Sequence, residues 1–281
     1  GVVQGNLTAN GATDLTIVSG SVNGRIYTND AATLRVLDGT NLSVTVNSPG
    51  TTVNIEGGTF RRTTCHYSQA CFGSKAVLYL SNTDLLMTGG TIPLYYNGCC
   101  DNFQQGVISL GGNSLATLSG ANLNCVDLEL SSADSRADLA SASILGIHLS
   151  SGSHVTLDEL SSAGGISGRG DLRIFGATLR TAQCGCGGWG SFGCDETTPA
   201  QGSVNLSGNG SVQMTHGGIE GDLTLNDSAY ALISGGTIGH SIHLNHSALA
   251  ELTGGALAGA SHFLSDGATL KISGGSVSES L

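Results

Sequence analysis

The amino-acid sequence contains few charged and few aromatic residues. Of its 281 residues, 11% are charged, 5% are aromatic and only three are proline. Ten lysine and arginine residues stand against 21 aspartate and glutamate residues, without a basic cluster, which argues against nucleic-acid binding. No stretch of about 20 apolar residues occurs, so no membrane-spanning helix is expected. No segment carries the apolar stripe and caps of an amphipathic helix, which leaves β structure.

What the sequence does contain is a repeat. A glycine pair followed within two residues by an apolar residue recurs at intervals of 18, 19 and 20 residues, with copies that start at Gly217, Gly235, Gly254 and Gly274. Residues 1–7 follow the pattern of residues 217–223, and weaker copies between them include residues 141–144 and 164–166. A period of this length is typical of a solenoid, in which each coil buries its apolar face only against neighbouring coils.

Within one coil the apolar residues alternate with polar ones. Ala229, Ala231 and Ile233 occupy every second position, and the next two coils repeat this alternation. A period of two predicts strands with one face inward, and the Asn, Asp, Ser and Gly residues between them predict tight corners. We therefore predict an all-β fold: one domain, residues 1–281, that forms a parallel β-helix (β-solenoid) of about 12 coils of 18–20 residues.

Eight cysteines favour an oxidising, extracellular setting. Seven of them lie in three irregular insertions, residues 61–74, 95–106 and 181–202, and each insertion follows the same point of its coil. The insertions should therefore emerge along one edge of the solenoid, either as disulfide-stapled loops or as a working face. The disulfide candidates, whose connectivity stays open, are Cys65, Cys71, Cys99, Cys100, Cys125, Cys184, Cys186 and Cys194.

The insertions also hold aromatic side chains that could contact a ligand, namely Tyr67, Phe72, Tyr95, Tyr96, Phe103 and Trp189. Cys184, Cys186 and Cys194 could instead hold zinc, with His216 as the fourth ligand, but no Cys-x-x-Cys pair occurs, so disulfides are favoured. His243 is expected to point outward, and His246 to occupy a solvated corner position. We predict neither a metal nor a cofactor.

Catalysis finds little support in the sequence. A β-helix that cleaves polysaccharides needs clustered carboxylates, with a basic residue or calcium, on one outward strand face. The acidic residues are sparse and lie mostly at predicted corners, as Asp30 and Asp227 do. The one candidate pair is Asp195 and Glu196, with Arg180 nearby. We predict a protein that is not an enzyme, and keep a polysaccharide lyase or hydrolase as the third alternative.

The phrase Ser-Gly-Gly-x-Ile/Val, as in residues 234–240 and 273–277, resembles the degenerate repeats of secreted bacterial β-solenoid surface proteins, including autotransporter passengers and adhesin stalks. The resemblance covers nearly the whole chain. It implies an extracellular or cell-surface scaffold or adhesin, without catalytic residues to carry over. The cysteine-bearing insertions depart from the cysteine-poor autotransporter pattern, which leaves the transport route open.

The two ends of the repeat decide the functional prediction. Solenoids normally close their ends with caps, because an open coil exposes strand edges and core. We expect no cap at either end, which fits either a fragment of a longer stalk or head-to-tail association through Gly1, Val3, Leu7, Ile272, Val277 and Leu281. We predict a secreted structural protein that assembles with itself into a filament. The alternative is an adhesin or glycan-binding module that uses the insertions to contact glycans or a cell surface.

Overall fold

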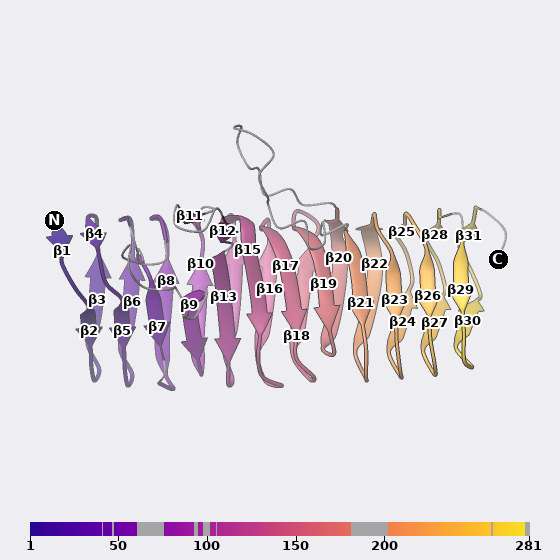
Figure 1. Ribbon diagram of the computed structural model, residues 1–281, viewed down its shortest axis with the longest axis horizontal. Helices are drawn as coiled ribbons and strands as arrows, with labels where there is room; N and C mark the ends of the chain where they lie inside the picture. The colour runs from indigo at the N-terminus through magenta and orange to yellow at the C-terminus, as the bar shows by residue number, and fades with distance from the viewer. Residues whose placement is uncertain are drawn as a thin grey trace.

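A computed structural model describes residues 1–40, 42–46, 48–60, 76–92, 95–97, 102–104, 106–180, 202–259 and 261–278. These residues form β-strands and turns without a helix, and therefore include no helix long and apolar enough to cross a membrane. The strands wind into a parallel β-solenoid of about 12 turns, confirming that part of the prediction. Figure 1 shows the coils stacked in one row, with the N- and C-termini at opposite ends.

Each coil has three faces, and the strands of each face pair in parallel with those of the coils before and after. Face 1 comprises β1 (Val2–Val3), β4 (Ser21–Val22), the starts of β15 (Asn122–Leu130), β17 (Ser143–Leu149) and β19 (Ser162–Gly168), the ends of β20 (Asp171–Leu179) and β22 (Ser211–Ile219), and β25 (Thr237–Ile238), β28 (Ala256–Leu257) and β31 (Ser276–Val277). Isolated bridges at Thr40, Leu42, Phe60 and Thr91 continue this face where no strand forms.

Face 2 comprises β2 (Leu7–Ala9), β5 (Ile26–Thr28), β7 (Val44–Val46), β9 (Ala76–Ser81), β13 (Gly106–Gly111), the ends of β15, β17 and β19, and β21 (Ser203–Leu206), β23 (Leu223–Leu225), β26 (Ile242–Leu244) and β29 (His262–Leu264). Face 3 comprises β3 (Asp14–Ile17), β6 (Thr33–Val36), β8 (Thr51–Ile55), β10 (Thr83–Met87), β14 (Leu115–Ser119), β16 (Arg136–Ala140), β18 (His154–Asp158), the starts of β20 and β22, and β24 (Tyr230–Ile233), β27 (Leu249–Leu252) and β30 (Thr269–Ile272).

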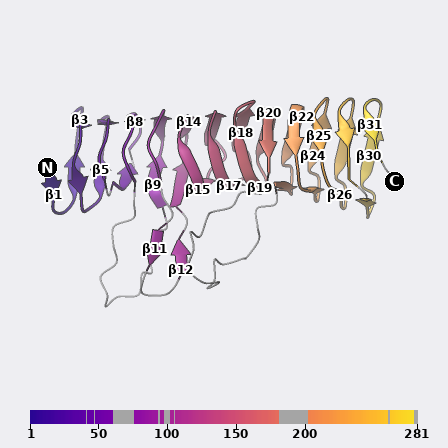
Figure 2. The ribbon, with the colours of Figure 1, turned by 90° about the horizontal axis from the view of Figure 1, so that it is seen from above.

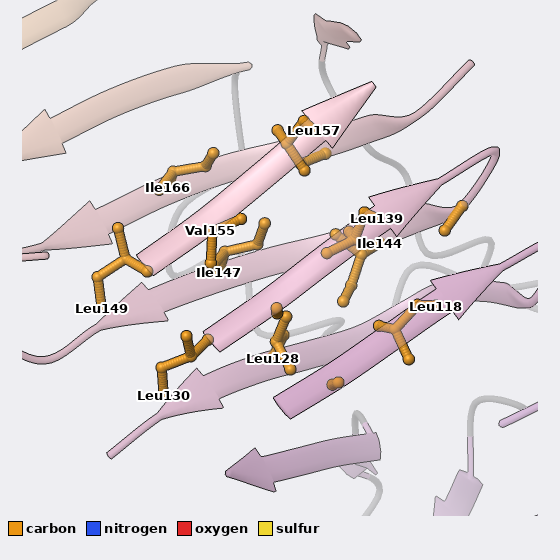
Figure 3. Close-up of a cluster of buried hydrophobic side chains, with 14 of the residues drawn as sticks. Leu118, Leu128, Leu130, Leu139, Ile144, Ile147, Leu149, Val155, Leu157 and Ile166 are labelled. Atoms are coloured by element: carbon orange, nitrogen blue, oxygen red, sulfur yellow. The ribbon is translucent and has the colours of Figure 1, made fainter. Parts of the chain in front are cut away.

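The core is a set of apolar ranks that run along the solenoid axis. On face 3, Leu118 pairs with Leu139 and Leu139 with Leu157, and all three are buried (Figure 3). On face 2, Ile147 and Ile166 form a similar rank. Because the strands alternate inward and outward residues, every coil contributes side chains to each rank. Burial of each leucine or isoleucine contributes about 1.5–3 kcal/mol, so stability grows with the number of stacked coils.

The glycine pair of the repeat has a steric origin. A Cβ on Gly254 would overlap the carbonyl oxygen of Ser234 in the preceding coil. The next residue, Gly255, has a φ of 82°, in the left-handed region that glycine adopts without steric cost. The first glycine therefore allows two coils to approach closely, and the second allows the chain to turn from face 3 into face 1.

A different corner, between faces 2 and 3, is stabilised by polar side chains. Asp227, His246 and Asp266 occupy the same turn position with φ values of 60°, 60° and 54°, which confirms the predicted corner position of His246. The preceding residues form a hydrogen-bonded ladder. The amide nitrogen of Asn226 donates to Asn205 Oδ1 (3.2 Å), and that of Asn245 donates to Asn226 Oδ1 (2.9 Å).

The register confirms most of the predicted repeat and corrects one copy. Val3 and Leu7 lie in the same ranks as Ile219 and Leu223, as the sequence pattern predicted. The assignment of residues 164–166 to the glycine repeat was wrong: Ile166 pairs with Ile147 and Val204 on face 2. That coil places Ser162 and Ala163 on face 1 instead, so the double glycine there was coincidental.

Candidate functional site

The described residues that flank the three insertions lie at one corner of the solenoid, between faces 1 and 2. The residues that precede them, Phe60, Ile92 and Leu179, all belong to face 1, and the residues that follow begin face 2. Cys125 lies at the same corner, between the face 1 and face 2 portions of β15. Within the 95–106 insertion, β11 (Tyr95–Asn97) pairs antiparallel with β12 (Asn102–Gln104), and Figure 2 shows this hairpin to one side of the coils.

Many of the residues predicted to act in the insertions lie outside the described part of the chain: Cys65, Cys71, Cys99, Cys100, Cys184, Cys186, Cys194, Tyr67, Phe72, Trp189, Asp195 and Glu196. In the backbone of the hairpin, Tyr96 pairs with Phe103, and Tyr95 with Gln104. Leu281 also lies outside the described residues. The candidate functional surfaces that the structure describes therefore lie on the coils.

The first coil exposes residues that occupy core ranks elsewhere. Val3 is 39% exposed, although its partner in the next coil, Val22, is buried. Leu7 and Leu15 pack against the core but are only partly buried. Among the described residues, no further coil stacks on the outer side of this first coil. Val2 points outward and is 63% exposed. The inward side chains of this coil form an apolar end surface, which we call the N-terminal end surface (Val3, Leu7, Ala9, Leu15 and Ile17).

The last described coil presents a matching surface. Leu264 and Ile272 are 45% and 42% exposed, whereas Leu244 and Leu252, their partners in the preceding coil, are buried. Val277 and Leu270 are partly buried against the core. With His262, these inward residues form the C-terminal end surface (His262, Leu264, Leu270, Ile272 and Val277).

His262 is a polar exception on the C-terminal end surface. Its Nδ1 accepts a hydrogen bond from the backbone N–H of Ile242 at 3.3 Å, and its Nε2 is buried without a partner among the described residues. Burial lowers the pKa of His262 below the ordinary value, and the nearby His243 lowers it further. On the outer side, His243 and Phe263 stack with ring centroids 4.9 Å apart. His243 thus alternates with the inward residues of β26, as predicted.

The polar ladder has a direction that differs between the two ends. In the steps from Asn29 to Asn10, Asn226 to Asn205, Asn245 to Asn226 and Ser265 to Asn245, the side chain of the later coil donates a hydrogen bond to that of the earlier one. At the C-terminal end, Ser265 Oγ donates to Asn245 Oδ1 (2.9 Å), which leaves its own oxygen able to accept. At the N-terminal end, Asn10 Oδ1 accepts from Asn29 (2.8 Å), which leaves the amide N–H groups of Asn10 able to donate.

A second polar cluster lies on face 3 and was missed by sequence reasoning. The outward positions of the adjacent strands β16, β18 and β20 carry Arg136, Asp138, His154, Asp171 and Arg173. His154 Nδ1 lies 3.1 Å from Asp171 Oδ2, and Ser211 Oγ in β22 donates to Asp171 Oδ1 (2.7 Å). The signal in the sequence was the run of polar residues at alternating strand positions, but it did not show that the three strands are neighbours.

At the rim of this cluster, a histidine reaches across one coil to bind a residue of the coil beyond it. His216 Nε2 lies 3.0 Å from Glu159 Oε1, and His216 Nδ1 lies 2.8 Å from Thr215 Oγ1. A Cβ on Gly176, in the coil between them, would collide with both Glu159 and His216. The missing side chain at Gly176 therefore makes the contact possible. Among the described residues, no three His, Cys, Asp or Glu side chains are grouped to hold a metal ion.

A third network lies on face 3 near the C-terminal end. Glu251 accepts hydrogen bonds from Lys271 Nζ (2.9 Å) and Tyr230 Oη (3.1 Å). The hydrogen bond from Lys271, followed by that from Tyr230, holds the pKa of Glu251 below its ordinary value. The same bond raises the pKa of Lys271, and burial raises that of Tyr230. The three side chains bind one another across three successive coils, so this network has a structural role.

Comparison with known proteins finds no relative: no family model, no curated protein and no solved structure matches the chain.

Proposed function

We propose that the protein is an extracellular structural protein whose solenoids stack head to tail into a filament. The observation that carries the proposal is the match between the two end surfaces. Both consist of inward residues that are apolar apart from His262, and both leave several of these residues exposed or only partly buried: Val3, Leu7 and Leu15 at one end, and Leu264, Leu270, Ile272 and Val277 at the other. Covering them with a second copy removes apolar area from water, which is the main favourable term in protein association.

The ranks define the register of this junction. With one copy placed on the next as a further coil, Val277 lies opposite Val3 and Ile272 opposite Ile17. On face 2, Leu264 lies opposite Ala9. These pairs continue ranks that are hydrophobic on both sides, and no inward acidic or basic pair is brought together.

Backbone and side-chain polarity support the same register. Parallel strands at both ends have one edge without a partner among the described residues, and such edges template pairing with another strand. In the stacked register, an Asn10 amide N–H donates to the free acceptor on Ser265 Oγ, in the direction that the ladder has inside each copy. The contact is heterologous, so it propagates as a filament and does not close a dimer.

Sedimentation velocity and negative-stain microscopy of the full chain, over a range of concentrations, test this proposal. We expect filaments with an axial repeat of about 55–60 Å, from about 12 coils at roughly 4.8 Å each. Val3→Asp or Ile272→Asp places a charge in the junction and should abolish them. Leu160→Asp is the matched control, since Leu160 is 75% exposed at a corner in the middle of the solenoid. Solitary rods at high concentration would refute the proposal.

We propose an extracellular setting because the chain contains eight cysteines, which favour an oxidising compartment. Insertions that leave one corner of three coils would decorate one edge of the filament, and disulfides would stabilise them. Intact mass measured on native protein, with and without a reductant, tests this: each disulfide adds about 2 Da on reduction. An unchanged mass would contradict the oxidised state, and with it the main support for secretion.

A further inference from the structure

The charged cluster on face 3 is unusual for this chain. Only 11% of all residues are charged, and most of face 3 carries Thr, Asn, Leu or Ser at its outward positions. In contrast, β16, β18 and β20 place five charged or imidazole side chains on neighbouring outward positions of three successive coils. Charged side chains that lie together on a flat, regular sheet are held in fixed relative positions by the backbone pairing beneath them.

Only part of this cluster is used by internal contacts. His154, Asp171 and Ser211 bind one another. In contrast, the side chains of Arg136, Asp138 and Arg173 form no hydrogen bond or ion pair with another described residue, and all three residues are exposed. Gln213, in the same outward row as Arg173, is also exposed, and its side chain has no hydrogen-bond partner among the described residues. Elsewhere on this face, Arg35 is paired with Glu56 at 2.8 Å. The free groups of the cluster are therefore available to a ligand.

An aromatic ring lies beside these polar groups. Phe175 follows Arg173 by two residues in β20, so it points to the same outward side, and 37% of it is exposed. Its neighbour in the next coil is His216, which Glu159 holds in place. An exposed ring next to fixed donors and acceptors is suited to a ligand that has both apolar C–H faces and hydroxyl groups.

We propose that the outward face of β16, β18, β20 and β22 binds a neutral polysaccharide chain. The guanidinium groups of Arg136 and Arg173 donate hydrogen bonds to sugar hydroxyl oxygens, and the Asp138 carboxylate accepts from a sugar hydroxyl. Phe175 packs against the face of a sugar ring. This site is separate from the end surfaces, so it does not depend on filament formation, and it is distinct from the insertions.

Charge decides between a neutral and an acidic ligand. Within the cluster, Arg136 and Arg173 are balanced by Asp138 and Asp171, and the chain as a whole carries a formal charge of −11. An acidic polymer would be repelled over distances up to about a Debye length, about 8–10 Å at physiological salt. The geometry favours a polymeric ligand, because equivalent outward positions recur at each coil, roughly every 4.8 Å along the axis. A chain that runs along the axis can therefore contact several coils in succession.

Affinity electrophoresis in native gels tests the proposal with the full chain. The probes are four neutral polysaccharides, dextran, galactomannan, xyloglucan and mixed-linkage β-glucan, and one acidic polysaccharide, polygalacturonate. We expect at least one neutral polysaccharide to retard the protein, and about 0.5 M NaCl to leave this retardation intact. Arg173→Ala and Phe175→Ala should each raise the dissociation constant about tenfold or more. Arg35→Ala, in the same outward row on β6, should leave it unchanged.

Several results would overturn the proposal. These are no retardation by any neutral polysaccharide, retardation by polygalacturonate alone, or wild-type binding by both Arg173→Ala and Phe175→Ala. Loss of binding in Trp189→Ala, with Arg173→Ala unaffected, would assign binding to the insertions instead. Circular dichroism melting curves of each variant show whether it is folded, and Asp138→Asn provides a second, nearly isosteric probe of the same face.

Discussion

The glycine pair of the repeat offers the sharpest test of the structure. Gly254 lies so close to the preceding coil that a Cβ there would overlap the carbonyl oxygen of Ser234. That oxygen belongs to the backbone, and a Cβ is fixed to the backbone of its own residue. No side-chain rotation can relieve this overlap, so Gly254→Ala must push two coils apart. Overpacking of this kind costs about 1–3 kcal/mol, and the rigid backbone on both sides places the expected loss at the upper end.

Gly50 provides the comparison, because it isolates backbone strain from steric overlap. Its φ is 79°, and a Cβ there would meet no atom within 4 Å. Gly50→Ala therefore costs about 1–2 kcal/mol for the left-handed conformation, offset by about 0.4–1 kcal/mol from the stiffer unfolded chain. Its net effect should be within about 1.5 kcal/mol of zero.

Denaturant unfolding followed by circular dichroism measures both variants, and hydrogen exchange locates the effect. For Gly254→Ala we expect a clearly lower midpoint and faster exchange in β24 and β27, the strands that lead into the affected corners. For Gly50→Ala we expect a small, local change. Equal losses in the two variants would contradict the close approach of coils as the reason for a glycine at position 254.

The remaining predictions concern the core and two titrating groups. Leu139→Ala removes a buried side chain from a rank with leucines on both sides, and should lower the unfolding free energy by about 2–5 kcal/mol in equilibrium denaturation. Glu251 has a folded pKa below its unfolded one, so its contribution is present above the unfolded pKa and is lost as pH falls through the folded pKa. Glu251→Gln should therefore flatten the melting temperature against pH in this acidic range, and an unchanged profile would contradict the network. His262 likewise has a lowered pKa, so below its ordinary value near 6.5 protonation should weaken the last coil and the proposed junction. His262→Leu should make assembly, measured by light scattering, insensitive to pH between about 5 and 7, and retained sensitivity would point to another group.

If both proposals hold, one molecule combines two separate surfaces. The end surfaces use the inward ranks, and the polysaccharide site uses the outward residues of face 3 in the middle of the solenoid. Stacking would then repeat the polysaccharide site once per subunit along a filament. A filament with many such sites binds a long polymer much more tightly than one subunit does, because the second contact forms within an existing complex.

The sequence alone determined the solenoid, because burial imposes a strict pattern on it. Residues such as Ala231 and Ile233 had to alternate with polar ones, and corners such as Asp227 had to accept left-handed geometry. The same pattern placed Phe60, Ile92 and Leu179, which precede the insertions, at one point of the coil. One double glycine, at residues 164–165, misled the assignment, since glycine pairs also occur where no corner needs them.

Only the tertiary structure decided which outward residues are neighbours. Asp171 bonds to Ser211, 40 residues later, and Glu159 to His216, 57 residues later, because an insertion separates their coils in sequence but not in space. Solvent imposes no periodic requirement on outward side chains, so their identities carry no pattern from which the pairing could be deduced. The three-dimensional stacking of coils of unequal length brings these polar residues together on one face.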